Sequence, residues 1–185
     1  MDFLCPDCAG DWPVVNAVMA HYQGKISVTL HTFPLPYHTF AFRAAQGAHA
    51  IAAINKTSPA EAVFQYAGMM FANQGDFYGA DLTTTQVDAH IAELASTKLG
   101  YSSAAVAAGL ADDNINEATR ISWKHAVSRY STGTPHCALS VWAFGPPLYH
   151  PPHTLPSLAL LHPPGLTPLT LPLLPALAAA PRHDQ

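Results

Sequence analysis

The sequence has few basic residues and no long apolar run. Its 185 residues include eight Lys and Arg against twelve Asp and Glu, so the formal net charge is −4 and no basic patch is available to attract phosphates. We therefore expect no nucleic-acid partner. No stretch of about 18 apolar residues is free of proline, which predicts that the chain does not span a membrane.

Cysteine is also scarce, and no targeting segment is visible. The odd count of three, Cys5, Cys8 and Cys137, does not suit a disulfide framework, so we expect at most one bridge, of a catalytic or transient kind. No basic stretch followed by an apolar one precedes Cys5. This leaves the compartment open, with the cytoplasm as the default. The hydrophobic content of 49% fits one domain with a real core.

Among the residues that are present, the pair in Cys5-Pro6-Asp7-Cys8 carries the strongest chemical signal. It opens an apolar helical run, and proline is tolerated in the first helical turn. At a helix N-terminus the free N–H groups and the macrodipole favour a thiolate over a thiol. Cys5 is then predicted to be the attacking group and Cys8 the resolving one, with the negative charge of Asp7 moderating the reactivity of Cys5.

The first third of the chain alternates helical and extended patterns. Apolar residues spaced by three or four predict a helix over residues 9–23, ended by Gly24. Residues 26–33 alternate apolar and β-branched polar types and predict a strand. The prolines at 34 and 36 make residues 33–38 a loop, and an alanine-rich helix is predicted over residues 39–55.

From residue 57 to residue 133 the signals are almost entirely helical. Ser58 followed by Pro59 predicts one helix start, and Thr83 to Thr85 predicts another. A further helix is expected from Ile115 to Tyr130. The Gly133-Thr134-Pro135 turn follows, and its X-Pro bond is a candidate cis peptide because proline alone makes the cis isomer inexpensive.

The end of the chain changes in composition. Residues 137–144 have strand character, whereas residues 144–185 hold eleven prolines and eleven leucines with no proline-free window longer than six residues. Such a segment can build neither an ordinary helix nor a central strand. We expect a domain over residues 1–143 and a Pro/Leu-rich, disordered tail over residues 144–185.

Taken together, the Cys-Pro-Asp-Cys helix start, the Phe33-Pro-Leu-Pro-Tyr-His38 loop and Gly133-Thr134-Pro135 resemble the DsbA-like branch of the thioredoxin-fold oxidoreductases. The resemblance covers about residues 1 to 140. It implies an α/β, thioredoxin-like fold with an inserted helical domain at about residues 57–115. Compared with that family, the chain reads as truncated at the first strand and altered after about residue 140, so we expect an incomplete sheet.

The resemblance also implies roles for individual residues. Cys5 matches the nucleophile, Cys8 the resolving cysteine, Pro135 the cis-proline beside the disulfide, and Thr134 a backbone contact for a bound substrate strand. The implied activity is thiol–disulfide exchange with a protein or small-molecule disulfide or dithiol. No metal or organic cofactor is required. Glutathione-using relatives of the fold fit less well, because they typically carry serine in place of the first cysteine.

Two other interpretations stay open at this point. One is a zinc-binding module in which Cys5, Cys8 and Cys137 are joined by His136 or His38. The other is a truncated thioredoxin-like product that keeps the motif without activity, because an incomplete sheet leaves backbone unpaired and reduces the core.

Overall fold

The structure of this chain is a computed structural model that describes residues 1–79, 81–129 and 133–137. The chain divides after Ser140 into two units, and all the described residues lie in the first. The Pro/Leu-rich tail predicted for residues 144–185 lies outside the described residues, and so does the strand predicted for residues 137–144, except for Cys137 itself.

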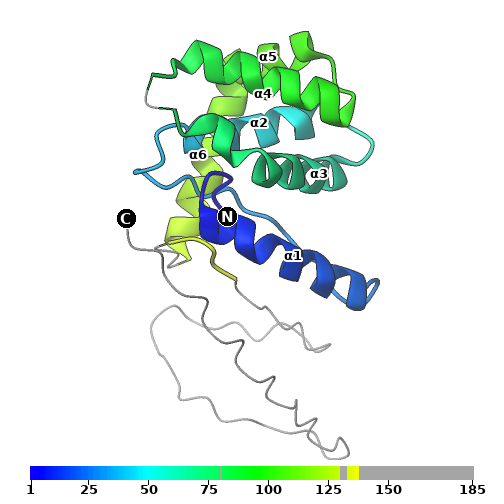
Figure 1. The fold of residues 1–185 in the computed structure, drawn as a ribbon. Coiled ribbons are helices and arrows are strands. Elements are labelled where there is room, and N and C mark those ends of the chain that lie inside the picture. Colours follow the sequence, from blue (N-terminus) through cyan, green and yellow to red (C-terminus); the bar gives the residue numbers. More distant parts are fainter. Residues whose placement is uncertain (80, 130–132, 138–185) are drawn as a thin grey trace, which may run out of the picture. The chain divides into compact units, whose positions relative to one another are not determined.

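The described residues form six α-helices and one short 3₁₀ helix. In chain order they are α1 (Pro6–His21), α2 (Ala41–Ile54), α3 (Pro59–Ala72), η1 (Gln74–Phe77), α4 (Thr84–Leu99), α5 (Ser103–Ala111) and α6 (Asp113–Ser128) (Figure 1). The helices predicted from apolar periodicity are confirmed within a few residues at each end. No helix in the described part of the chain is long and apolar enough to cross a membrane.

The strand predicted for residues 26–33 is wrong, because the described residues contain no strand and this segment has no regular secondary structure. Among the described residues, its backbone-to-backbone hydrogen bonds are with Met1, whose amine donates to His31 O at 2.7 Å and whose carbonyl accepts from Phe33 N at 2.8 Å. Ile26 and Val28 are exposed. An alternating pattern forms a strand only where a neighbouring backbone supplies the inter-strand hydrogen bonds. Among the described residues, Met1 alone supplies backbone groups to this segment.

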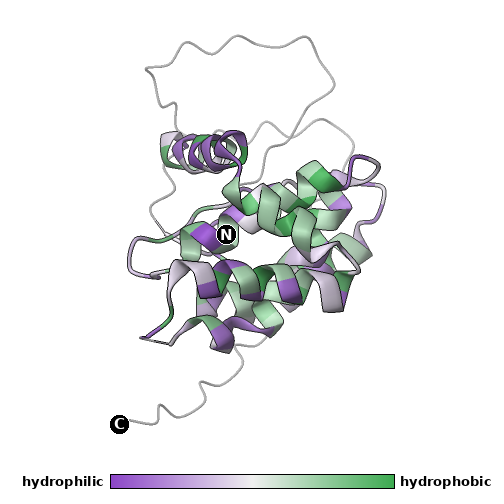
Figure 2. Ribbon diagram, turned by 90° about the horizontal axis from the view of Figure 1, so that it is seen from above, coloured by the Kyte–Doolittle hydropathy of each residue, from purple (hydrophilic) through white to green (hydrophobic). Residues whose placement is uncertain are grey.

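Helix α2 lies at the centre of the helical part and packs against α3, α4, α5 and α6 (Figure 1). Its many alanines allow this close approach: Ala44, Ala48 and Ala50 are at most 1% exposed. A side chain at Gly109 on α5 would place its Cβ only 2.7 Å from the Ala50 Cβ, so glycine is required for this contact. Figure 2 shows the same core from another side, with green, hydrophobic stretches on the helices.

Short polar side chains fix where several helices begin. Thr83 and Gln86 form the reciprocal capping box of α4, which confirms the helix start predicted there. The Ser102 hydroxyl accepts from Ala105 N at the start of α5, and the Asp112 carboxylate accepts from Asn114 N at the start of α6. Helix α6 therefore begins two residues before the predicted Ile115.

Helix α1 is attached to the helical core through Trp12. The Trp12 ring stacks on Phe64 at 5.7 Å between centroids and lies 5.2 Å from the Phe71 ring, both on α3. Because Trp12 is 9% exposed and lies one helical turn beyond Cys8, this contact holds the first half of α1, and with it the two cysteines, against α3.

Candidate functional site

The two cysteines of the motif stand at the start of α1, as the sequence predicts. Cys5 is the N-cap residue, Pro6 is the first helical residue, and Cys8 lies in the first turn. Both are free thiols, with Cys5 4% exposed and Cys8 fully buried. The two cysteines are thus held at the N-terminal end of α1, where the first backbone N–H groups have no partner within the helix.

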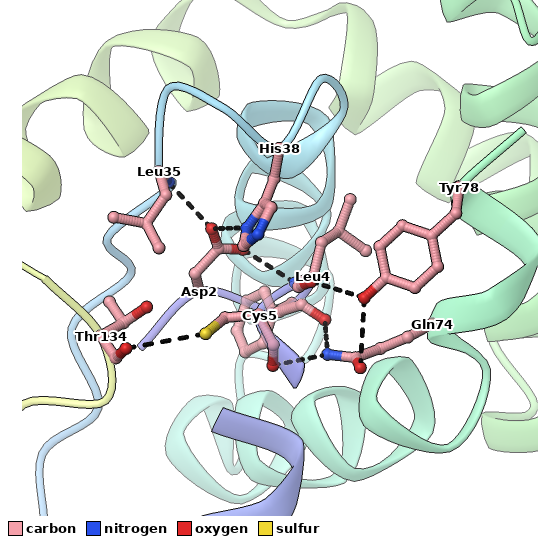
Figure 3. A network of polar contacts seen from close by, with 9 residues as sticks. Asp2, Leu4, Cys5, Leu35, His38, Gln74, Tyr78 and Thr134 are labelled. Carbon is pink, nitrogen blue, oxygen red and sulfur yellow. Dashed lines mark hydrogen bonds and ion pairs between the residues drawn. The ribbon is translucent and has the colours of Figure 1, made fainter. Parts of the chain in front are cut away.

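The segment that contains Thr134, far from the motif in sequence, packs against these thiols. The Cys5 Sγ donates to the backbone oxygen of Thr134 at 3.6 Å, across 129 residues of sequence (Figure 3). The Thr134–Pro135 peptide bond is cis. The sequence had marked this bond as a candidate for that isomer. The three residues Cys5, Cys8 and Thr134, which the sequence selected separately, are therefore brought together by the structure.

The environment of Cys8 is apolar and disfavours its charged form. Cys5, Cys8, Phe33 and Leu35 form one buried cluster. Burial raises the pKa of the Cys8 thiol to about 11, and the neighbouring Cys5 adds to the increase, although the Thr134 hydroxyl and the Asp2 backbone act in the opposite direction. At neutral pH Cys8 is consequently a protonated thiol that must lose its proton when it reacts.

The Thr134 side chain faces the same buried thiol. Its hydroxyl is buried and has no hydrogen-bond partner among the described residues. It interacts with Cys8, where it lowers the thiol pKa. Thr134 thus lies beside both thiols: its carbonyl oxygen accepts from Cys5, and its hydroxyl is near enough to Cys8 to lower the pKa of that thiol.

A buried carboxylate organises the backbone just before Cys5. The Asp2 side chain is fully buried and accepts from Leu4 N at 2.8 Å, from Leu35 N at 2.9 Å and from His38 Nδ1 at 2.8 Å (Figure 3). Three donors compensate for the cost of removing a carboxylate from water. Asp2 therefore joins the residues before α1 to the loop at residues 33–38.

The side chains of Gln74 and Tyr78 hold residues 3–5 by donating hydrogen bonds to their carbonyl groups. Gln74 Nε2 donates to Phe3 O and to Cys5 O, both at 2.9 Å, and the Tyr78 hydroxyl donates to Leu4 O at 2.6 Å (Figure 3). Burial raises the pKa of Tyr78, and the negative charges of Asp2 and Cys5 add to this increase. Three consecutive carbonyl oxygens are thus fixed by side chains from η1 and the residue that follows it.

The residues of the alternative zinc site do not assemble in the part of the chain that the structure describes. Among those residues, no group of three or more His, Cys, Asp or Glu side chains is placed to hold a metal ion. Cys137 is exposed, unlike Cys5 and Cys8, and His38 is bonded to Asp2. The zinc-binding interpretation therefore finds no support among the described residues.

Sequence reasoning missed Asp2, Gln74 and Tyr78 as parts of this site. Asp2 carries a weak local signal, since an acidic residue three positions before a Cys-x-x-Cys pair is unusual beside otherwise apolar neighbours. Gln74 and Tyr78 carry none, because their partners lie about 70 residues away and a turn rich in polar residues is ordinary in itself.

Comparison with protein-family models gives a match over most of the chain. Residues 1–136 match a family model with the description "Thioredoxin". No curated protein and no solved structure gives a significant match.

Proposed function

The chain belongs to the DsbA-like thioredoxin family, and from that premise we propose that it is a thiol–disulfide oxidoreductase with Cys5 as the nucleophile and Cys8 as the resolving cysteine. Its substrates are protein or small-molecule disulfides or dithiols. The contact that carries the proposal is the one between the Cys5 Sγ and the Thr134 carbonyl oxygen, 3.6 Å apart and next to cis-Pro135.

The reaction is a pair of exchanges that balance in sulfur, protons and electrons. The Cys5 thiolate attacks one sulfur of a substrate disulfide, a Cys5–substrate bond forms, and the other substrate sulfur leaves as a thiolate that takes a proton. Cys8 then loses its proton and attacks the Cys5 sulfur. The substrate leaves as a dithiol and the protein keeps the two-electron oxidised Cys5–Cys8 bridge. The reverse sequence oxidises a substrate dithiol.

The residues around the thiols support these roles. Cys8 is fully buried and its pKa is raised to about 11, so it stays protonated while Cys5 reacts first. We assign the Thr134 backbone, which accepts from the Cys5 thiol, to contact a substrate strand that approaches Cys5. We assign Pro135, whose peptide bond with Thr134 is cis, to the proline position beside the disulfide.

Trapping the covalent intermediate tests the proposal. In a chain carrying Cys8→Ser and Cys137→Ser, the Cys5–substrate bond has no internal thiol to resolve it and should accumulate with a peptide disulfide, as detected by mass spectrometry. Cys137→Ser alone should exchange normally, and adding Cys5→Ser should abolish trapping. A folded double variant that forms no adduct at Cys5, together with a wild-type protein that shows no exchange, would reject the oxidoreductase.

A further inference from the structure

The third cysteine, Cys137, belongs to the segment that packs against the motif, and it differs from the other two thiols in exposure. It is exposed and free, whereas Cys5 is 4% exposed and Cys8 is fully buried. It follows Thr134 by three residues, and the Thr134 carbonyl oxygen accepts from the Cys5 Sγ at 3.6 Å (Figure 3). Three residues of fully extended chain span at most about 11 Å, and residues 133–135 are bent. Cys137 is therefore tethered to the segment that contacts Cys5.

The Met1 amine gives a second indication of where Cys137 lies. Met1 packs against the buried cluster that contains Cys5 and Cys8. Burial lowers the pKa of its amine, and negative charge on Cys8, Asp2, Cys137 and Cys5, in decreasing order, opposes this effect. Because the Coulomb interaction weakens with distance and with contact to water, the exposed Cys137 must lie at least as close to the amine as Cys5 does. All three thiols thus lie near the Met1 amine.

The protonated state of Cys8 leaves time for a competing thiol to react. A mixed disulfide at Cys5 is resolved by a thiolate, and a thiol with a pKa of about 11 is ionised in only about one molecule in 10⁴ at pH 7. Cys137 is exposed, so water can solvate its thiolate and accept its proton. The mixed disulfide at Cys5 is therefore open to a second thiolate before Cys8 ionises.

We propose that Cys137 is a second resolving cysteine, which attacks the Cys5 sulfur of the mixed disulfide and forms a Cys5–Cys137 bridge. The Cys137 thiol loses its proton, the bond between Cys5 and the substrate breaks, and the substrate sulfur leaves as a thiolate that takes a proton. The substrate is thus reduced by two electrons and the protein is oxidised by two. Attack of Cys8 on the Cys5 sulfur of this bridge then forms Cys5–Cys8 and returns Cys137 to the thiol, without net redox change. The proposal rests on the proposed oxidoreductase function.

Removing Cys8 isolates this step in the full chain. In Cys8→Ser, the adduct that a peptide disulfide forms at Cys5 should decay at least about tenfold faster than in Cys8→Ser, Cys137→Ser, because a tethered thiol acts at an effective concentration of millimolar order. The decay should not depend on protein concentration. Trypsin separates residues 1–25, which hold Cys5 and Cys8, from residues 130–182, which hold Cys137. Mass spectrometry of the acid-quenched, non-reduced digest should find these two peptides joined.

The matched control moves the third thiol to another surface. Ser103→Cys, added to Cys8→Ser, Cys137→Ser, places a thiol at an exposed residue at the start of α5, which packs against α2, α4 and α6. The adduct at Cys5 should live as long in this variant as in the double variant. Equally fast decay with the Ser103→Cys thiol would overturn the proposal, because any exposed thiol would then suffice.

An adduct that lives equally long with and without Cys137 would also overturn the role of Cys137, and would leave Cys5 supported as the nucleophile. If Cys8→Ser does not fold, the wild-type digest decides: the joined peptides should appear before the Cys5–Cys8 bridge accumulates, and their absence would overturn the proposal. Failure of the double variant to form any adduct, together with a wild-type protein that shows no exchange, would reject the oxidoreductase and this proposal with it.

Discussion

Cys8 differs from an ordinary surface thiol because of what surrounds it. It is fully buried against Phe33 and Leu35, and burial raises the pKa of its thiol to about 11. Such a residue is poorly suited to attack first, since the thiolate is the nucleophile. It is well suited to react second: after a mixed disulfide has formed at Cys5, the Cys8 thiol can lose its proton and attack.

The stability of the reduced protein should therefore fall between pH 9 and pH 11. A thiol whose pKa rises from 9.0 to about 11 on folding binds more protons in the folded state, so its stabilising effect is fully present below pH 9 and is lost as the pH passes 11. Chemical denaturation should show wild type losing roughly 2 to 3 kcal/mol more than Cys8→Ala over this range. Parallel losses in the two proteins would contradict the raised pKa.

The residues of the site divide into those that sequence could identify and those it could not. Cys5, Cys8 and Thr134 carry local signals, a Cys-x-x-Cys helix start and a Gly-Thr-Pro turn. Asp2 accepts from a backbone group 33 residues away, and Gln74 donates to backbone groups about 70 residues away. A polar residue that satisfies a distant backbone group leaves no periodic pattern, so only the folded chain identifies it.

At the scale of elements, the helices follow from the sequence and the strand does not. The 3.6-residue apolar period of α2, α3 and α4 depends on one buried face and is readable locally. The alternating pattern of residues 26–33 forms a strand only beside another strand. In the described chain, Met1 is the only backbone partner of this segment. In place of a ladder, side chains of Asp2, Gln74 and Tyr78 hold the backbone that leads into α1.

Contacts from the short helix η1 should therefore affect both the stability of the protein and the reactivity of Cys5 at the start of α1. Gln74→Glu keeps the shape but loses the N–H donors to Phe3 O and Cys5 O and adds a negative charge beside them. We expect a loss of unfolding free energy on the order of 3 kcal/mol and slower alkylation of Cys5 at neutral pH, measured in a Cys8→Ser, Cys137→Ser background.

Gln65→Glu is the matched control, because it makes the same charge change on α3 at an exposed residue whose amide contacts only Glu61 at 3.5 Å. It should lower the free energy of unfolding by only about 0.5 kcal/mol, the size of a like-charge pair four residues apart on a helix surface, and leave alkylation of Cys5 unchanged. Equal effects of the two substitutions would show that net charge, and not the Gln74 contacts, governs the reactivity of Cys5.

At the scale of the molecule, the site joins three segments that are far apart in sequence. Residues 2–8 supply the thiols, residues 33–38 surround Cys8 and hold Asp2, and Thr134 closes over both sulfurs. Gln74 and Tyr78 hold residues 2–8 against the helical core by donating to their carbonyl groups. Among the described residues, the contacts of this arrangement are made by residues 2–134, within the part of the chain that matches the family.

A chain ending at residue 143, the domain boundary that composition predicts, should therefore keep the site. We expect cooperative thermal unfolding, a helical circular dichroism spectrum and trapping at Cys5 within about twofold of the full chain, because the described core and site contacts lie within residues 1–137. Broad, non-cooperative unfolding of both chains would instead favour a thioredoxin-like product without activity. Loss of cooperativity in the shorter chain alone would show that residues 144–185 contribute to the folded domain.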